Sequence, residues 1–110
     1  MAGNAYKTLG QSYPAATTLT DLYTVPASTQ TVVSSIIVCN HSGSASTFRI
    51  SLAPAGAADA NAQYLYFDVP IGANDTFVAT IGIGMQTTDK LRCYSGNGSI
   101  SFTAVGSEIS

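Results

Sequence analysis

The sequence predicts an all-β protein, a single antiparallel β-sandwich of about eight short strands of Ig-like or jelly-roll type, with an extended N-terminal arm. Three observations support this prediction. Apolar and polar residues alternate over short stretches, as they do in half-buried strands. Clusters of Gly, Pro, Asn, Asp and Ser separate these stretches and are typical of turns. No segment shows the periodicity of a long helix.

The length and composition indicate one domain with few surface charges. The chain has 110 residues, of which 45% are hydrophobic and only 9% are charged, whereas about 25% charged residues is usual for soluble domains. Mixed charge normally keeps monomers apart. A polar but weakly charged surface therefore favours a protein that neighbours cover in an assembly, with a Ser/Thr-rich monomeric domain as the alternative.

The charges and the N-terminal sequence argue against two classes of partner. The net charge is −2, and the cations Lys7, Arg49, Lys90 and Arg92 form no basic stripe, so we expect no nucleic-acid binding. Residues 1–10 contain no apolar signal-peptide region, and no apolar run reaches the length of a membrane helix. We therefore expect no membrane partner, and synthesis in a cytoplasm.

Residues 1–20 form the expected N-terminal arm, and residues 21–110 form the expected sandwich domain. The arm shows neither a period of two nor a helical period, and Pro14 interrupts it. We expect one short strand around residues 6–9 and little other regular structure. Because terminal arms fray unless something holds them, we expect this arm to be mobile in a free monomer and to lie on a neighbour in an assembly.

Residues 21–40 are the segment around which the domain is built. A short strand ends at Val25, a turn follows at residues 26–28, and the most β-branched run of the sequence occupies residues 31–39. Under strict alternation this run has two apolar faces, with Val33, Ile37 and Cys39 on one side and Val32, Ile36 and Val38 on the other. Either this central strand is therefore buried on both sides within the domain, or the arm or another subunit covers its second face.

Further strands are expected at residues 47–52, 63–69, 76–83, 90–95 and 99–105. Gly82 and Gly84 indicate a bulge, and the run from Gly96 to Gly98 indicates a hairpin turn. In strand 63–69 the alternation places Tyr64 and Tyr66 on the outer side, as a second contact surface. The side chains expected to face the core are Phe48, Ile50, Leu52, Leu65, Phe67, Val69, Phe77, Ala79, Ile81, Ile83, Leu91, Cys93, Ile100, Phe102 and Ala104.

The reactive residues form no recognisable catalytic or metal-binding pattern. Cys39 and Cys93 both fall at predicted inward positions, so an inter-sheet disulfide is conceivable, but a reducing compartment favours two buried thiols. His41 is the only histidine and lies in a turn cluster, and no serine sits in a nucleophile elbow. The carboxylates are isolated in sequence. We therefore expect no catalytic, cofactor or metal site, and no enzymatic activity.

Several segments resemble small virion proteins of tailed bacteriophages. The most specific of these segments are LYTVPA at residues 22–27, VCN at 38–40, QYLYFDVPI at 63–71 and NDTF at 74–77. The resemblance covers nearly the whole chain from Leu9 onward and consists of structural signatures without catalytic motifs. Among these proteins, the sequence is most similar to capsid cement (decoration) proteins.

The resemblance implies a β-sandwich that binds the outer surface of the mature phage head and stabilises it by bridging subunits of the major capsid protein. It also implies a homotrimer or homodimer, synthesis in the host bacterial cytoplasm and a final location on the capsid exterior. The alternative within the virion is a tail, neck or fibre component that binds a host glycan through an exposed loop. A soluble monomeric binding module is the alternative outside the virion. The expected contact residues, in the arm or among exposed aromatics, are Tyr6, Leu9, Tyr13, Pro14, Tyr64 and Tyr66.

Overall fold

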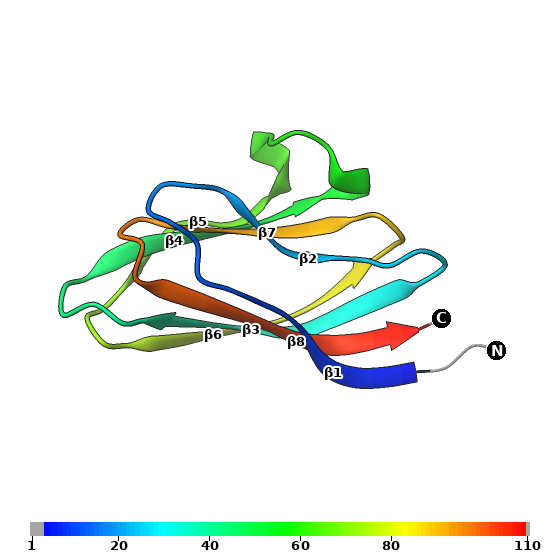
Figure 1. Ribbon diagram of the computed structural model, residues 1–110, viewed down its shortest axis with the longest axis horizontal. Coiled ribbons are helices and arrows are strands. Elements are labelled where there is room, and N and C mark those ends of the chain that lie inside the picture. The colour runs from blue at the N-terminus through cyan, green and yellow to red at the C-terminus, as the bar shows by residue number, and fades with distance from the viewer. Residues whose placement is uncertain (1–3, 110) are drawn as a thin grey trace.

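The computed structural model describes residues 4–109, which form two four-stranded antiparallel sheets (Figure 1). One sheet, here called sheet A, contains β1 (Asn4–Ser12), β8 (Ile100–Ile109), β3 (Gln30–Asn40) and β6 (Thr76–Met85), adjacent in that order. The other, sheet B, contains β2 (Thr20–Thr24), β7 (Lys90–Ser95), β4 (Ser46–Ala53) and β5 (Tyr64–Ile71), adjacent in that order. The two sheets pack face to face, so the predicted antiparallel β-sandwich is confirmed.

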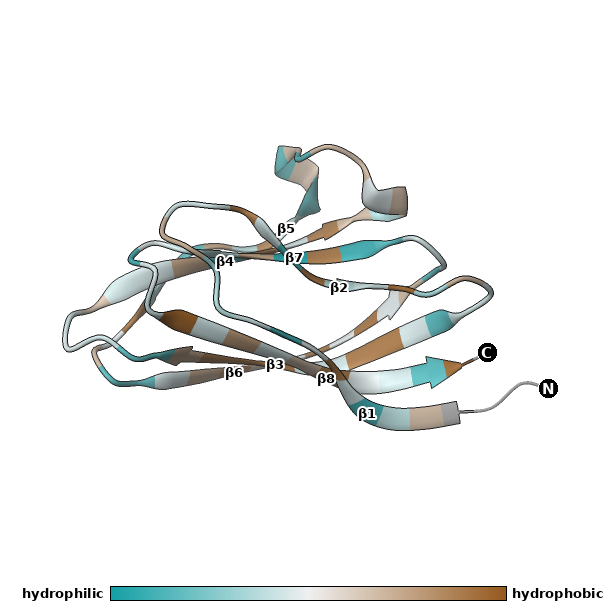
Figure 2. Cartoon of the chain, in the orientation of Figure 1, coloured by the Kyte–Doolittle hydropathy of each residue, from teal (hydrophilic) through white to brown (hydrophobic). Residues whose placement is uncertain are grey.

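The core lies between the sheets and is dominated by Phe48 of β4. The ring centroid of this fully buried side chain lies 5.4 Å from that of Phe77, 6.2 Å from that of Phe102 and 6.3 Å from that of Tyr66. Burying each large apolar side chain stabilises the fold by about 1.5–3 kcal/mol. Figure 2 shows the alternation that produces this core, with apolar positions between polar or neutral ones along β8. The other large, fully buried hydrophobic residues are Val25, Val33, Ile36, Val38, Ile50, Leu91, Cys93 and Ile100.

The central strand β3 has one buried and one exposed face, and the predicted division of its residues was wrong. Val33, Ile36 and Val38 are fully buried, whereas Val32 and Ile37 are 42% and 36% exposed. The reason is a shift in register between Val33 and Ser35, in the pairing with both neighbouring strands. An extra residue at this point moves every later side chain to the opposite face. Burial of β3 on both sides within the domain is therefore excluded.

Strand β5 was misassigned for the same reason. Its pairing with β4 shifts register twice, between Phe48 and Ile50 and between Ile50 and Ser51. Tyr66, expected on the outer side, packs against the core, whereas Phe67, expected in the core, is 54% exposed. Leu65 was also expected in the core and is exposed. The largest exposed aromatic ring of β5 is therefore that of Phe67.

The described part of the expected arm lies on the sandwich. Strand β1 contains the expected strand 6–9 and pairs with β8 along its length. Residues 13–19 then cross to sheet B, where the backbone N–H of Thr17 donates to the carbonyl of Ser95 at 2.8 Å. Residues 1–3 lie outside the described residues, and the division of the chain at residue 20 stays a prediction.

The crossing depends on Gly10, which directly follows Leu9, the extra residue at the register shift in β1. A Cβ atom at this position would lie 2.2 Å from the carbonyl oxygen of Leu22 in β2. Only glycine allows the two backbones to approach this closely. Sheets A and B therefore meet directly at the end of β1.

Asn40 is the last residue of β3, and its buried side chain holds this end of the strand in place. Its amide nitrogen donates to the carbonyls of Ser44 and Gly72, both at 3.0 Å, and its Oδ1 accepts from the backbone N–H of Ser42 at 3.0 Å. One buried amide therefore holds the loops that follow β3 and β5.

Candidate interaction surfaces

The outer face of sheet A is a four-stranded surface without charged side chains, here called the uncharged face. The register places residues in rows across the strands, and one such row runs from Val78 on β6 through Ile37 and Thr103 to Gln11 on β1. Residues directly opposite in paired strands share a face. The outward side chains are Tyr6, Thr8 and Gln11 from β1, Ser101, Thr103, Val105 and Ser107 from β8, Val32, Ser35, Ile37 and Cys39 from β3, and Thr76, Val78 and Thr80 from β6.

Exposed aliphatic side chains lie among hydroxyl groups on this face. Val78, which is 54% exposed, is the direct cross-strand partner of Ile37. Val32 and Ile109 are the other large exposed aliphatic residues of sheet A. These residues were not among the predicted contact residues, although the two apolar sides of segment 31–39 were the sequence signal that pointed to them.

Two aromatic residues of the arm border the uncharged face. Tyr6 is 70% exposed, and its hydroxyl is hydrogen-bonded to Ser34 Oγ at 2.8 Å, so its side chain reaches from β1 across β8 to β3. Tyr13 is also exposed, and its ring lies edge-on to that of His41, with centroids 5.6 Å apart. His41 Nε2 is hydrogen-bonded to Ser101 Oγ at 2.9 Å. Both tyrosines are thus exposed, as expected, and held in place.

The other two contact residues expected in the arm are less accessible. Pro14 is buried, and Leu9 is half-buried because it packs against the core cluster. Their role as contact residues stays a prediction, and the structure leaves them less surface than the two tyrosines. A contact surface on the arm would therefore consist mainly of the rings of Tyr6 and Tyr13.

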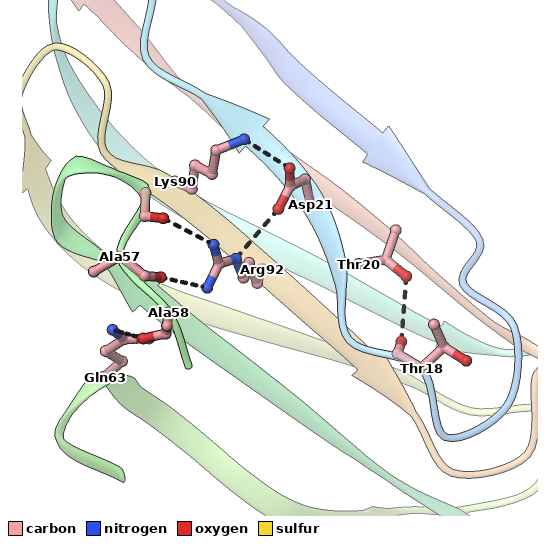
Figure 3. Close-up of polar contacts among 9 residues, drawn as sticks. Thr18, Thr20, Asp21, Ala57, Ala58, Gln63, Lys90 and Arg92 are labelled. Carbon is pink, nitrogen blue, oxygen red and sulfur yellow. Dashed lines mark hydrogen bonds and ion pairs between the residues drawn. The ribbon is translucent and has the colours of Figure 1, made fainter. Parts of the chain in front are cut away.

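The outer face of sheet B is charged. Figure 3 shows Asp21 between two cations, with Lys90 Nζ 2.8 Å from Oδ2 and Arg92 Nε 3.2 Å from Oδ1. Arg92 also donates to the carbonyls of Ala57 and Gly56, at 2.8 and 3.3 Å, and so holds the connection between β4 and β5. The hydrogen bond from Lys90, followed by that from Arg92, lowers the pKa of Asp21 below its ordinary value, against the opposing effect of burial.

That connection contains two short 3-10 turns, η1 (Pro54–Gly56) and η2 (Asn61–Gln63), and lies on the outer side of sheet B (Figure 1). Gln63 Nε2 donates to the carbonyl of Ala58 at 2.8 Å, which closes the connection on itself (Figure 3). These contacts give the connection a fixed shape over sheet B.

A second group on sheet B, here called the arginine–aromatic cluster, consists of Arg49, Tyr64, Phe67, Asp68 and Tyr94. The Arg49 guanidinium carbon lies 4.1 Å from the ring centroid of Phe67 and 4.3 Å from that of Tyr94. Its Nε and Nη2 donate to the two carboxylate oxygens of Asp68 at 2.6 and 3.2 Å. Such a pinned guanidinium stacked on aromatic rings is rigid.

Tyr64 joins this cluster, whereas Tyr66 does not. The Tyr64 ring lies edge-on to Phe67 at 5.0 Å, and its hydroxyl donates to Asp59 at 2.9 Å. Burial and the neighbouring Asp59 raise the pKa of Tyr64. Tyr66 packs instead against Phe48 and Phe77, so the second predicted contact surface contains Tyr64 and Phe67 in place of Tyr64 and Tyr66.

A partly buried polar group ties the arm to both sheets. The Tyr23 hydroxyl donates to Glu108 Oε2 at 2.5 Å and is hydrogen-bonded to Thr31 Oγ1 at 2.8 Å, while Lys7 Nζ lies 2.7 Å from Glu108 Oε1. Burial, with the hydrogen bond to Glu108, raises the pKa of Tyr23 to about 12. The hydrogen bonds from Lys7 and Tyr23 lower the pKa of Glu108. Side chains of β1, β2, β3 and β8 are thereby joined.

The two cysteines lie in different environments, and both are free thiols. Cys93 faces the core, where burial raises its pKa to about 11. Cys39 was expected to face inward as well, but the bulge in β3 places it on the uncharged face beside Ser101 and Thr76. The geometry for an inter-sheet disulfide is therefore absent, and of the two thiols expected to be buried, Cys93 is buried whereas Cys39 is not.

Among residues 4–109, no group of three His, Cys, Asp or Glu side chains is placed to hold a metal ion. The described part of the chain also contains no helix that is long and apolar enough to cross a membrane.

Comparison with known proteins gives a likeness at the level of fold. No family model matches the sequence, and no curated protein matches it either. Among solved structures, a chain in the structure of infectious bursal disease virus, Gx strain, is similar, with a TM-score of 0.50 and 14% sequence identity. The likeness covers 99% of this chain but 31% of that chain, so this chain spans about a third of its length. At this identity the comparison shows a shared sandwich fold alone.

Proposed function

We propose that this chain is a structural protein of a phage virion, and specifically a capsid cement protein on the outside of the mature head. Its partners are the major capsid protein and further copies of itself, as a homotrimer or homodimer, without a nucleic-acid or membrane partner. It acts by binding and performs no catalysis. The phage-like sequence segments and the fold shared with a chain of a virus structure support this proposal.

The observation that supports it best is the uncharged face. A sheet surface of hydroxyl and aliphatic side chains, with Val32, Ile37 and Val78 exposed, can be covered without desolvating an ion. Burying a charge that loses its water is costly unless a partner charge is well placed. The uncharged face is therefore the surface of this molecule that a large protein neighbour can cover at the lowest cost.

The mechanism is stabilisation by differential binding. A subunit that binds only the expanded head lattice favours that lattice, because a ligand shifts an equilibrium by its difference in affinity for the two states. At a free concentration of about 100 times Kd, each site contributes about 2.7 kcal/mol. Repetition over the many equivalent sites of a capsid converts this modest contribution into mechanical strength.

Cosedimentation with purified expanded and unexpanded heads tests this function. We expect the chain to sediment with expanded heads. Ile37→Lys is expected to bind about 30-fold more weakly, because the unpaired charge that it buries in the interface costs about 2 kcal/mol of binding free energy. Ala58→Lys adds the same charge at an exposed position over sheet B and is the matched control, expected to bind like the wild type.

Urea denaturation checks that the Ile37→Lys and Ala58→Lys variants are folded. Tyr6→Ser and Tyr13→Ser are expected to weaken head binding by smaller factors, because each removes one ring at the border of the uncharged face. Binding to tails and not to expanded heads would contradict the cement function. Equal binding of Ile37→Lys and Ala58→Lys would exclude the uncharged face as the docking surface.

The arginine–aromatic cluster favours a second candidate, a tail, neck or fibre component that binds a host glycan. Asn61, Tyr64 and Phe67 line an open hollow of about 390 Å³ on the outer side of sheet B. Aromatic rings beside an amide and a carboxylate can contact both the C–H face and the hydroxyl groups of a sugar ring. Binding of the isolated chain to host surface polysaccharide, lost in Phe67→Ala, would support this candidate.

A further inference from the structure

Three of the four sheet edges carry features that discourage pairing with another strand. Edge strand β1 has the charged Lys7 and a bulge, and edge strand β2 has only five residues, with Asp21 and a bulge among them. Edge strand β5 has two register shifts as well as Asp68 and Pro70. Charges, proline, bulges and short length are the features by which proteins protect sheet edges.

The first half of the fourth edge strand, β6, has none of these features. Residues 76–80 pair continuously with residues 35–39 of β3, and they include no charge and no proline. The bulge of β6, at Gly82 with a φ of +58°, comes after them. Because β6 is the last strand of sheet A, the other side of this segment has no neighbouring strand among the described residues. Apart from the N–H of Thr76, which donates to Asp75 Oδ1 at 2.8 Å, it is a regular edge without charges of its own and open to a further strand.

The sequence of this segment is suited to pairing with itself. Thr76, Val78 and Thr80 are exposed on the uncharged face, whereas Phe77 and Ala79 point toward the core side. In an antiparallel pair centred on Val78, each Thr76 lies opposite Thr80 of the other copy, and the two Val78 side chains lie opposite each other. On the inner side, the large Phe77 meets the small Ala79. The Thr–Thr and Val–Val cross-strand pairs on the outer side are favourable, and on the inner side a large residue packs against a small one.

We propose that β6 pairs with β6 of a second copy of this chain, antiparallel and centred on Val78, to form a two-fold dimer with a continuous eight-stranded sheet. The pair is isologous, so each copy satisfies the open edge of the other. It covers the exposed Val78 and the half-buried Phe77 and joins two uncharged faces into one wider surface. This dimer specifies the homodimer of the proposed function and rests on it to that extent, but it forms from the isolated chain and is tested without a virion.

Disulfide trapping tests the register. In a Cys39→Ser background, Val78→Cys places two thiols at directly opposed positions, where Cα atoms of antiparallel strands lie about 4.5–5.5 Å apart, within the range of a disulfide. The remaining Cys93 is buried in the core. We expect mild oxidation to yield a covalent dimer of Val78→Cys. Val32→Cys, equally on the uncharged face but on β3, is the control and is expected to stay monomeric on a denaturing gel.

Sedimentation equilibrium of lysine variants that keep both native cysteines measures the strength of dimerisation. Val78→Lys brings two like charges together at the two-fold axis and is expected to weaken dimerisation at least tenfold, whereas Val32→Lys leaves it within about twofold. A monomeric wild-type chain at about 100 μM, or equal trapping of Val78→Cys and Val32→Cys, would overturn the proposal. A monomer that still binds expanded heads, but loses binding in Val78→Lys, would also overturn it and assign the edge to a strand of the capsid protein.

Discussion

The two outer faces of this sandwich differ in how much it costs to cover them. The face of sheet B has the Asp21, Lys90 and Arg92 ion pairs and the stacked Arg49, all solvated in part. The face of sheet A has hydroxyl groups, aliphatic side chains and one thiol. Since both faces belong to one small domain, the contrast shows where the few charges of the chain are placed, and which face remains available for a protein neighbour at low desolvation cost.

The contrast also explains the low charge content of the sequence. Three of the four cations, Arg49, Lys90 and Arg92, are paired with carboxylates on sheet B. The fourth, Lys7, pairs with Glu108 near the end of the sheets. The few charges of the chain are therefore concentrated on sheet B and at the end of the sheets. A charge introduced on the outer face of sheet A is expected to weaken binding of a protein neighbour more than one introduced on sheet B.

The largest expected effect on stability comes from Gly106, which lets β8 approach β3 closely beneath the uncharged face. A Cβ atom at this position would lie 2.0 Å from the Val32 carbonyl oxygen, so Gly106→Ala is expected to lower the free energy of unfolding by about 3 kcal/mol. At Gly84, also in sheet A, an added Cβ meets nothing within 4 Å. Urea denaturation of Gly106→Ala and of the control Gly84→Ala measures the difference, and equal midpoints would contradict the close approach.

A smaller effect is expected from Arg49→Lys, which separates stability from binding. Lysine cannot reproduce the two-pronged contact with Asp68 or the planar stacking on Phe67, so we expect a loss of about 1 kcal/mol in the free energy of unfolding. Because Arg49 lies on sheet B, head binding is expected to stay within twofold of the wild type. A loss of head binding comparable to that of Ile37→Lys, at unchanged stability, would mean that the charged face takes part in docking.

The smallest expected effect is the acid sensitivity of the charged face. The pKa of Asp21 is lowered in the folded chain from 3.8, so its contribution is present above this pH and is lost as the pH falls through the folded value. Since the ion pair is exposed, Asp21→Asn is expected to cost about 0.5 kcal/mol at pH 7. Denaturation curves measured from pH 7 to pH 2.5 should converge for wild type and variant at the acid end, and a constant difference would contradict the assignment.

The sequence was sufficient to predict the sandwich and most of its core, because the alternation in strands such as β7 and β8 continues without interruption. Leu91, Cys93, Ile100 and Phe102 are buried where this pattern puts them. The faces of β3 and β5 were not predictable in this way. Strand β3 has one extra residue relative to β8, and β5 has an extra residue at two points relative to β4; each extra residue exchanges the two faces without changing the composition.

The candidate surfaces were predictable only in part. The exposed tyrosines of the arm followed from sequence, but the uncharged face did not, because it is assembled from four strands distant in the chain. Strand order and register place Val78 beside Ile37, and neither is encoded in a local pattern. Phe67 was likewise hidden, since alternation alone assigned it to the core.

A reconstruction by electron microscopy of the particle that contains this chain is the most direct test of the central claim. We expect density for the chain on the outside of the expanded head, with Val32 and Ile37 of sheet A against neighbouring subunits and with Arg49 and Asp21 of sheet B toward solvent. The opposite orientation, with the charged face against the particle and the uncharged face fully solvated, would contradict it.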